Sequence, residues 1–362
     1  MKINSWVDNS FKDNIFGFLK KMNIKGDYTN FKYSLSGDLY DSSTKWGLGQ
    51  LVFATKILHM IDVLKDIESV NKLNLVNAIY SFQRNDGTFT DTTLFGQKKK
   101  SILDKLMMKN DDDSYHEQII RAETRQSFAA LMTLGAIPIK PYTYLPYSEK
   151  EVNNYLSSLN WKEPWGAGSH FSHLLFFYKA NKEMFDYKSD LATNLIDYSI
   201  KWVNSLQSNI DGTWHDGDVP LSQKINGAMK ILIGFSTVNY YKLSYVESFI
   251  DTILSGVNDG HACDNFNIVY CLYFASKLTN YRNEEIQKFC IDRLNIYKGY
   301  YHEKEGGFSF YQNRANDVYY GAKITKGLNE PDIHGTVMFL WGITLISRII
   351  NIQGLDLKEP IT

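Results

Sequence analysis

A short polar turn recurs along this chain, and each copy stands between two stretches of helical spacing. The two clearest copies contain Gln, then Asp-Gly-Thr, then an aromatic residue, and they span 83–89 and 207–214. Looser copies occur at 258–261 and 305–308. A repeating unit of this size predicts stacked helical hairpins, because one hairpin cannot bury its own apolar face.

Apolar residues recur at helical spacing in twelve stretches, which alternate between two kinds. Stretches of the first kind are amphipathic and begin near residues 4, 72, 149, 191, 244 and 284. Stretches of the second kind are apolar nearly all round and begin near residues 45, 117, 169, 222, 264 and 332. Amphipathic helices pack one face and wet the other, whereas helices apolar all round are enclosed. The pattern predicts an all-α fold, an (α/α)6 barrel (toroid) of six helical hairpins.

The 362 residues fit a single toroid domain that spans 1–362. Long segments at about 90–116, 136–148 and 309–331 interrupt the helical pattern, which continues on both sides of each. We therefore interpret them as elaborated loops on one barrel rather than as domain linkers. The sequence leaves open whether loop 90–116 closes as a lid.

The composition limits the classes of partner. A net charge of -1 gives no electrostatic reason to expect nucleic acid. The longest apolar run, near Val337 to Ile346, is too short to cross a membrane, so we expect no transmembrane segment. Three cysteines without a CxxC pair argue against a disulfide framework and favour a reducing cytoplasm. The oligomeric state stays open.

Each enclosed stretch begins with polar residues and becomes apolar within about two helical turns. In a barrel of hairpins the inner helices run the same way, so their N-termini meet at one mouth. Helix dipoles and unpaired N–H groups favour an anionic or oxygen-rich ligand there. Capping explains Ser, Asp and Asn at helix starts. It does not explain cations and imidazole within the helices, namely Arg121, Arg125, Lys224 and His334.

These patterns predict a polar, cationic site at the mouth of the barrel that binds a small-molecule or oligosaccharide substrate. Side chains that can switch charge in an enclosed site are the catalytic candidates: His334, Asp264, His170, His173 and Glu123. Cations, capping polar groups and stacking indoles are the substrate-binding candidates: Arg121, Arg125, Lys224, Asn226, Trp46, Trp165, Trp214 and Asp332.

A metal is also possible from the sequence. Cys263, Asp264 and His334 offer a thiolate, a carboxylate and an imidazole from the starts of adjacent inner helices, which suits zinc. His170 and His173 are three residues apart on one helix face, as metal or acid–base pairs often are. Ordinary caps and solvated ion ladders remain the alternative for all these residues.

The repeated Gln…Asp-Gly-Thr-Trp/Phe turns resemble the QW-type repeats of squalene and terpenoid cyclases and of protein prenyltransferase β subunits. The segment 335–343, Gly-Thr-Val-Met-Phe-Leu-Trp-Gly-Ile, resembles the closing G-T-x-x-x-L-x-G-L pattern of that superfamily. The resemblance covers about 45–350. It implies an (α/α)6 barrel with its site in the central cavity, and either acid-started cyclisation of a polyprene or zinc-dependent prenyl transfer.

The chain differs from both catalytic signatures of that superfamily. The nearest string to the cyclase motif D-x-D-D is 110–113, which begins with Asn. In the transferase pattern Asp precedes Cys by two residues and a late His precedes the Thr of the last helix. Here Cys263 comes before Asp264, and Gly335 occupies the position of that His.

Three functions are therefore open. The first is an enzyme that acts on an anionic substrate such as an isoprenoid diphosphate. Arg121, Arg125 and Lys224 would bind the anion, with Lys230 as a further candidate. The second is a carbohydrate-active enzyme, either a uronate lyase or a glycoside hydrolase, since such toroids also host those activities. A hydrolase would pair Asp264 with Glu123 or Asp332. The third is a non-catalytic toroid that binds a partner or a lipid.

Overall fold

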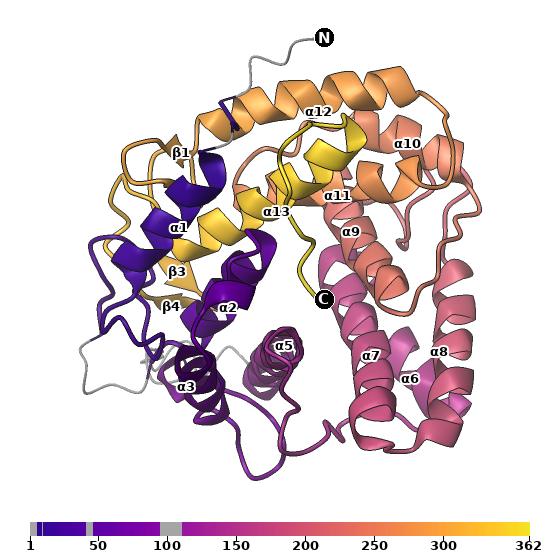
Figure 1. Ribbon diagram of the computed structural model, residues 1–362. Helices are drawn as coiled ribbons and strands as arrows, with labels where there is room; N and C mark the ends of the chain where they lie inside the picture. Colours follow the sequence, from indigo (N-terminus) through magenta and orange to yellow (C-terminus); the bar gives the residue numbers. More distant parts are fainter. Residues whose placement is uncertain (1–5, 9, 41–45, 95–110) are drawn as a thin grey trace, which may run out of the picture.

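The computed structural model describes residues 6–8, 10–40, 46–94 and 111–362, and within the helix 111–133 it describes side chains from residue 116 onward. Within these residues the fold is mostly helical (Figure 1). Twelve α-helices and two short 3-10 helices lie there: α1 (Phe11–Met22), α2 (Leu48–Met60), η1 (Leu64–Asp66), α3 (Ser69–Tyr80), η2 (Thr92–Leu94), α5 (Asp111–Thr133), α6 (Glu149–Ser158), α7 (Pro164–Phe185), α8 (Ser189–Asn204), α9 (Leu221–Thr237), α10 (Val246–Leu254), α11 (Ala262–Ser276), α12 (Asn283–Lys298) and α13 (Ile333–Ile349).

The remaining regular structure is two short hairpins between α12 and α13. Strand β1 (Tyr301–His302) pairs with β2 (Gly307–Phe308), and β3 (Val318–Tyr319) pairs with β4 (Ala322–Lys323), both antiparallel. The segment predicted as a loop at 309–331 therefore contains the β3–β4 hairpin, whereas 136–148 has neither helix nor strand. Most of the predicted loop 90–116 lies outside the described residues, and α5 already begins at Asp111.

The helices are of the two kinds that the sequence predicts. On α8 the buried residues recur every three or four positions, so one face packs and the other is wet. On α11 every residue from Asn265 to Ala275 is buried. Buried polar starts are capped locally: the carboxylate of Asp332 accepts the N–H of Gly335 at 2.7 Å and thereby fixes the start of α13.

The enclosed helices contact one another in chain order. Helix α2 packs on α5, α5 on α7, α7 on α9, α9 on α11 and α11 on α13, and α13 packs back on α2. The amphipathic helices lie outside them, as Figure 1 shows for α12, α10 and α8 beside α13, α11 and α7. The contacts between enclosed helices thus form a closed cycle.

The two clearest turn repeats share one geometry. The Gln83 side chain donates to the carbonyl of Gly87 at 3.2 Å, and the Gln207 side chain donates to the carbonyl of Gly212 at 2.9 Å. Each Asp of the turn accepts the N–H of the Thr two residues later. The aromatic residue that follows, Phe89 or Trp214, is fully buried. The repeated sequence is therefore a repeated structural device that anchors a buried ring beside each hairpin.

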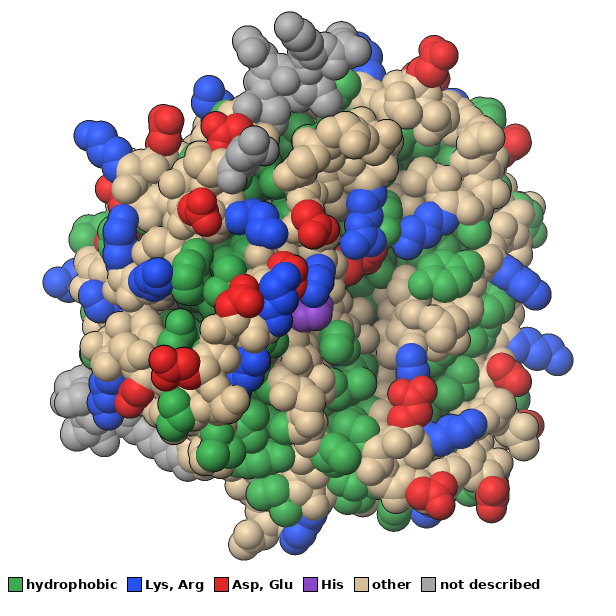
Figure 2. All heavy atoms as spheres, viewed as in Figure 1, with side chains coloured by type: hydrophobic (Ala, Val, Ile, Leu, Met, Phe, Trp, Pro, Cys, Tyr) green, Lys and Arg blue, Asp and Glu red, His purple; other side chains and the backbone are tan. Residues whose placement is uncertain are grey.

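Residues 355–362 lie across the C-terminal ends of several enclosed helices. The N–H of Lys358 donates to the carbonyl of Met60 on α2, and Thr237 on α9 donates to the carbonyl of Thr362. Glu359 accepts from Tyr273 of α11 at 2.6 Å and pairs with Arg348 of α13. Figure 2 shows this face of the molecule, where acidic and basic side chains gather around its centre.

Candidate functional site

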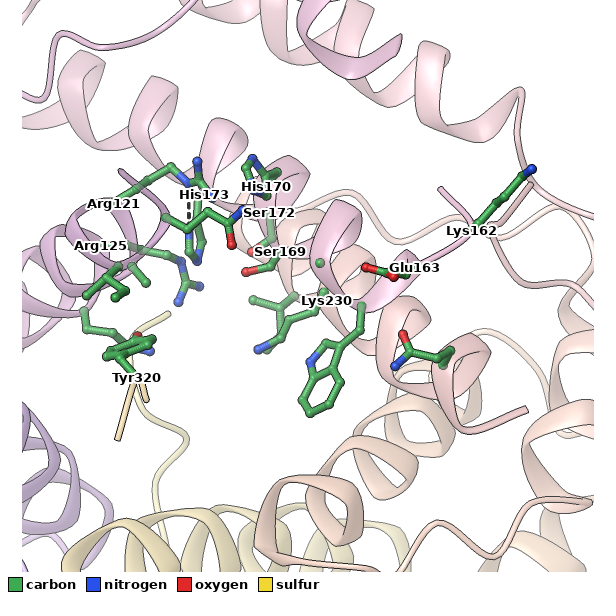
Figure 3. Close-up of a pocket in the computed structure, with 18 of the residues that line it drawn as sticks. Arg121, Arg125, Lys162, Glu163, Ser169, His170, Ser172, His173, Lys230 and Tyr320 are labelled. Atoms are coloured by element: carbon green, nitrogen blue, oxygen red, sulfur yellow. Dashed lines mark hydrogen bonds between the residues drawn. The ribbon is translucent and has the colours of Figure 1, made fainter. Parts of the chain in front are cut away.

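A cavity of about 950 Å³ lies between the N-terminal halves of α5, α7 and α9. We call it the α5–α7–α9 cavity. Figure 3 shows its lining, in which Arg121 and Arg125 come from α5, His170 and His173 from α7, and Lys230 from α9. Of the predicted site residues, these cations and histidines lie together here with Trp165.

Two histidines on α7 form part of the cavity wall and are held by hydrogen bonds. Nε of Arg121 donates to Nδ1 of His173 at 3.3 Å, and Nδ1 of His170 lies 2.9 Å from the hydroxyl of Tyr155. Burial, reinforced by Arg121, lowers the pKa of His170 to about 3. Burial and then Arg125 lower the pKa of His173 well below its usual value. Both rings are therefore neutral at pH 7 and able to accept a proton.

Arg125 lies deeper in the cavity than Arg121 along α5 and is only 5% exposed. Its guanidinium is 5.1 Å from the ring centroid of Phe176, and its Nε and Nη2 are buried without a hydrogen-bond partner in the described part of the chain. Burial lowers the pKa of Arg125 to about 10, so the guanidinium stays charged at neutral pH.

Lys230 projects from α9 into the same space (Figure 3). Burial lowers the pKa of its amine, and repulsion from Arg125 lowers it further. Tyr320 enters the cavity from the turn between β3 and β4, where it adopts a left-handed backbone with φ of 46°. Tyr320 was not predicted, because the sequence does not indicate where the side chain of a residue in a long loop lies.

Lys56 on α2 is a second lysine near the cavity that sequence reasoning missed. It is 4% exposed, and its Nζ donates to Oε1 of Gln126, a residue that lines the cavity. Burial, followed by repulsion from Arg125 and Lys230, lowers the pKa of Lys56 to about 7. A signal existed, since Lys56 interrupts an otherwise apolar run from Leu51 to Leu58.

Glu163 lines the cavity with the cations, but no carboxylate pairs with Lys56, Arg125 or Lys230 among the described residues. These three groups repel one another. They come from three different helices of the closed cycle, α2, α5 and α9. The described part of the chain therefore gives these three cations no ion-pair partner.

The predicted metal ligands lie elsewhere. His334, near the start of α13, stacks on Phe53 with ring centroids 4.7 Å apart, and burial lowers its pKa to about 3. Burial raises the pKa of the Cys263 thiol to about 12, which disfavours the thiolate that a metal needs. Asp264 accepts from Asn226 at 2.9 Å and lies 3.4 Å from His261. Among the described residues no three His, Cys, Asp or Glu side chains are placed to hold a metal ion.

Other predicted substrate-binding residues make structural contacts. Lys224 is on α9, as Lys230 is, but it does not line the cavity. Its amine pairs with the carboxylate of Asp211 in the turn at 2.7 Å. Asp332 accepts three backbone N–H groups, from Gly335, Phe310 and Asn316. Asn226 is buried and also accepts from Asn267 at 2.8 Å. These contacts are complete without a ligand.

The remaining predicted site residues, which are Trp214, Trp46 and Glu123, also make contacts away from the α5–α7–α9 cavity. Trp214 is fully buried and packs edge-on against Phe235. Trp46 donates to Asp38 at 3.0 Å and lines a separate cavity of about 330 Å³ between α2 and α3. Glu123 accepts the N–H of Asp91 at 2.9 Å, and burial raises its pKa well above the usual value. None of these three lines the α5–α7–α9 cavity.

Comparisons of the chain with protein-family models, with curated proteins and with solved structures find no match. In the described part of the chain, no helix has both the length and the apolar character needed to cross a membrane. The chemistry of the cavity itself must therefore carry any statement of function.

Proposed function

We propose that this protein is an enzyme that binds a small anionic substrate in the central cavity of an (α/α)6 barrel. The closed cycle of contacts among the six enclosed helices supports the barrel. One observation carries the anionic substrate: Arg125 and Lys230 line the cavity with no carboxylate partner among the described residues. We therefore assign the proposed cationic site to the interior of the cavity as well as to its mouth.

Physical chemistry favours an anion at these two side chains. A buried charge without a counter-ion is costly, so such groups are normally paired or bound to a ligand. The guanidinium of Arg125 can give two parallel hydrogen bonds to a phosphate or carboxylate, and Lys230 adds a point charge. Glu163 and Pro220, the residues that precede α7 and α9, line the cavity, so the N-termini of these two helices contribute further positive potential.

The shape of the cavity limits the substrate to a small molecule with an anionic group. A volume of about 950 Å³ lies within the usual range for small-molecule sites. Its walls also present Trp165, Ile119 and Ile233, which suit an apolar portion. The first candidate is an isoprenoid diphosphate, and a uronate with its carboxylate is the alternative. Burial and the neighbouring arginines hold the pKa of His170 and His173 low, and a bound anion would raise it, so we assign both imidazoles to proton transfer once the substrate is bound.

Calorimetry and thermal shift test this proposal. The purified chain is titrated with inorganic pyrophosphate, farnesyl diphosphate and digalacturonate, and the binding constants are compared. Replacing a cation by an apolar residue of similar volume removes its charge with little change in packing. Arg125→Met and Lys230→Met should each weaken binding at least about tenfold, since a charge-assisted hydrogen bond contributes about 1.5 to 3 kcal/mol. The melting temperature should not fall, because an unpaired buried charge is removed.

Lys201→Met is the matched control, because Lys201 is exposed on α8 and its replacement changes the net charge by the same amount. It should bind as the wild type does. Preference for farnesyl diphosphate over pyrophosphate would support the isoprenoid substrate, and preference for digalacturonate would support the carbohydrate alternative. If none of the three ligands binds, or if both cavity variants bind as tightly as the control, the proposal is wrong.

A further inference from the structure

Lys56 differs from every other residue of the proposed anion site in being a buried amine with a single acceptor. Its Nζ reaches across from α2 to α5, where it donates to Oε1 of Gln126. Gln126 is part of the cavity wall, so the amine lies directly behind the lining. An ammonium has three N–H donors, and one acceptor leaves the other two unpaired in a site that is 4% exposed.

The charged groups around Lys56 all oppose its protonation. Arg125 of α5 and Lys230 of α9 lower its pKa, and Lys56 in turn lowers the pKa of His334 on α13. Together with burial, this brings the pKa of Lys56 to about 7. Protonation of Lys56 is therefore disfavoured relative to an exposed lysine, so a neutral amine with a free lone pair is more accessible there. A lysine desolvated beside other cations is the usual arrangement of an amine nucleophile.

We propose that Lys56 is a nucleophile that forms an imine with an anionic carbonyl compound, whose carboxylate or phosphate is held by Arg125 and Lys230. The inference rests on the proposed anion site for the positioning of the substrate. It goes beyond that site by adding a covalent step and by requiring an aldehyde or ketone group. The two cations that depress the protonation of Lys56 are the same groups that would hold the substrate.

The step balances without an oxidant or a reductant. The Nζ lone pair attacks the carbonyl carbon, a C–N bond forms, and the C=O π electrons move to the oxygen, which takes a proton. The resulting carbinolamine then loses its C–O bond. Both hydrogens of the amine leave with the oxygen as water, and the product is the imine. Once protonated, that imine withdraws electrons from the neighbouring carbon, which assists proton removal or loss of a carboxylate there.

Reductive trapping on the whole chain tests the proposal. The protein is incubated at neutral pH with pyruvate and sodium cyanoborohydride, and in a second arm with pyridoxal 5′-phosphate and the same reductant. Peptide mass spectrometry then locates the adducts. Lys56 should be labelled before exposed lysines, because burial and the two neighbouring cations favour its unprotonated form. Faster labelling by pyruvate indicates a carboxylate substrate, and faster labelling by pyridoxal phosphate indicates a phosphate substrate.

The variants separate this proposal from the anion site. Lys56→Met should lose the adduct yet still bind pyrophosphate, while Lys201→Met should keep both. Arg125→Met should slow labelling of Lys56 about tenfold or more. Labelling of Lys56 that Arg125→Met leaves unchanged would overturn the anion site and leave the imine standing. Wild-type protein that binds pyrophosphate but gives adducts at exposed lysines and none at Lys56 overturns the imine. This last result needs no variant, so a folding defect in Lys56→Met cannot obscure it.

Discussion

The hydroxyl of Tyr33 lies 3.0 Å from Nδ1 of His334 and forms a hydrogen bond with it, although the two residues are 301 positions apart in the chain. Asn316 donates to the same hydroxyl at 3.0 Å. Burial, followed by repulsion from His261, lowers the pKa of His334 to about 3.

The lowered pKa of the buried His334 imidazole predicts a pH-dependent contribution of this residue to the free energy of unfolding. The unfolded chain protonates His334 below about pH 6.5, whereas the folded chain does not until about pH 3. Stability from this group is therefore complete above pH 6.5 and is lost as the pH falls toward 3. The wild type should lose about 1.4 kcal/mol per pH unit relative to His334→Gln in that range. Urea denaturation of both proteins between about pH 7 and pH 5 measures it.

The stability of the wild type must be compared with that of His334→Gln, because other buried titratable groups change the free energy of unfolding in the opposite direction as the pH falls. Burial raises the pKa of Asp332 to about 7 and that of Glu123 well above its usual value, so both favour the folded state as the pH falls. These contributions are common to both proteins and cancel. A wild-type-minus-variant difference that stays constant with pH would show that His334 is protonated equally in the folded and unfolded states.

Asp332 is expected to act on stability and not on binding. Its carboxylate accepts the N–H of Gly335, Phe310 and Asn316 at 2.7, 2.7 and 3.0 Å. In Asp332→Asn an amide NH2 replaces one carboxylate oxygen and leaves at least one buried N–H facing a donor. Each such donor costs about 1 to 3 kcal/mol, so the free energy of unfolding should fall by at least about 1 kcal/mol. Asp356→Asn, at an exposed position, should change it by less than about 0.5 kcal/mol. Lost ligand binding with unchanged stability would instead assign Asp332 to the site.

Gly212 of the second turn repeat predicts a steric requirement. It adopts φ of +69°, and a Cβ there would lie 2.6 Å from the backbone nitrogen of Phe249. Gly217 has a similar φ of +72° but open space around it, which makes it a matched control for backbone strain. Gly217→Ala should cost about 1 to 2 kcal/mol, and Gly212→Ala about 1 to 3 kcal/mol more. Equal losses in thermal unfolding would mean that the turn and α10 do not approach as closely as described.

The order and kind of helices follow from the sequence closely. Starts predicted near 149, 222 and 332 are found at Glu149, Leu221 and Ile333, where polar caps give way to apolar runs. Three starts differ by five residues or more, and one of them is that of α7, which begins at Pro164 rather than near 169. The first helix begins at Phe11 rather than near 4, because the mixed pattern before it is not helical at residues 6–8. Helix α5 begins at Asp111, since acidic residues favour a helix N-terminus. Because these residues were assigned to the loop 90–116, the prediction missed the first turn of α5.

The site could be predicted only in part. Arg121, Arg125, His170 and His173 were recognisable because they follow the polar starts of enclosed helices, and Trp165 was chosen as a stacking indole; all five line one cavity. Sequence spacing does not give the direction in which a side chain leaves its helix. Lys224 and Lys230 are both cations on α9, yet one pairs with Asp211 and the other enters the cavity. The sequence likewise does not distinguish Trp165, which lines the cavity, from Trp214, which is fully buried against Phe235.

Removal of residues 355–362 should destabilise the fold measurably. Leu357 is buried, Lys358 pairs with Asp62, and Glu359 pairs with Arg348. Loss of the buried leucine alone costs about 2 to 5 kcal/mol. A chain ending at residue 354 should therefore lose at least that much in urea denaturation. Lys358→Ala, which removes one exposed ion pair, should lose no more than about 1 kcal/mol. A truncated chain as stable as this control would show that the segment is not docked.

In the barrel that we propose, residues 355–362 distinguish one end from the other. They cross the ends of α2, α9, α11 and α13 that lie opposite the polar starts of the helices, whereas Trp165 and Gln223 line the cavity near those starts. Passage of a ligand through the covered end would require the docked segment to move. An elongated ligand that delivers its charge to Arg125 and Lys230 from the other end would enter with the charged end leading. Its product would leave by the same route, and a second substrate would bind only after the first product had gone.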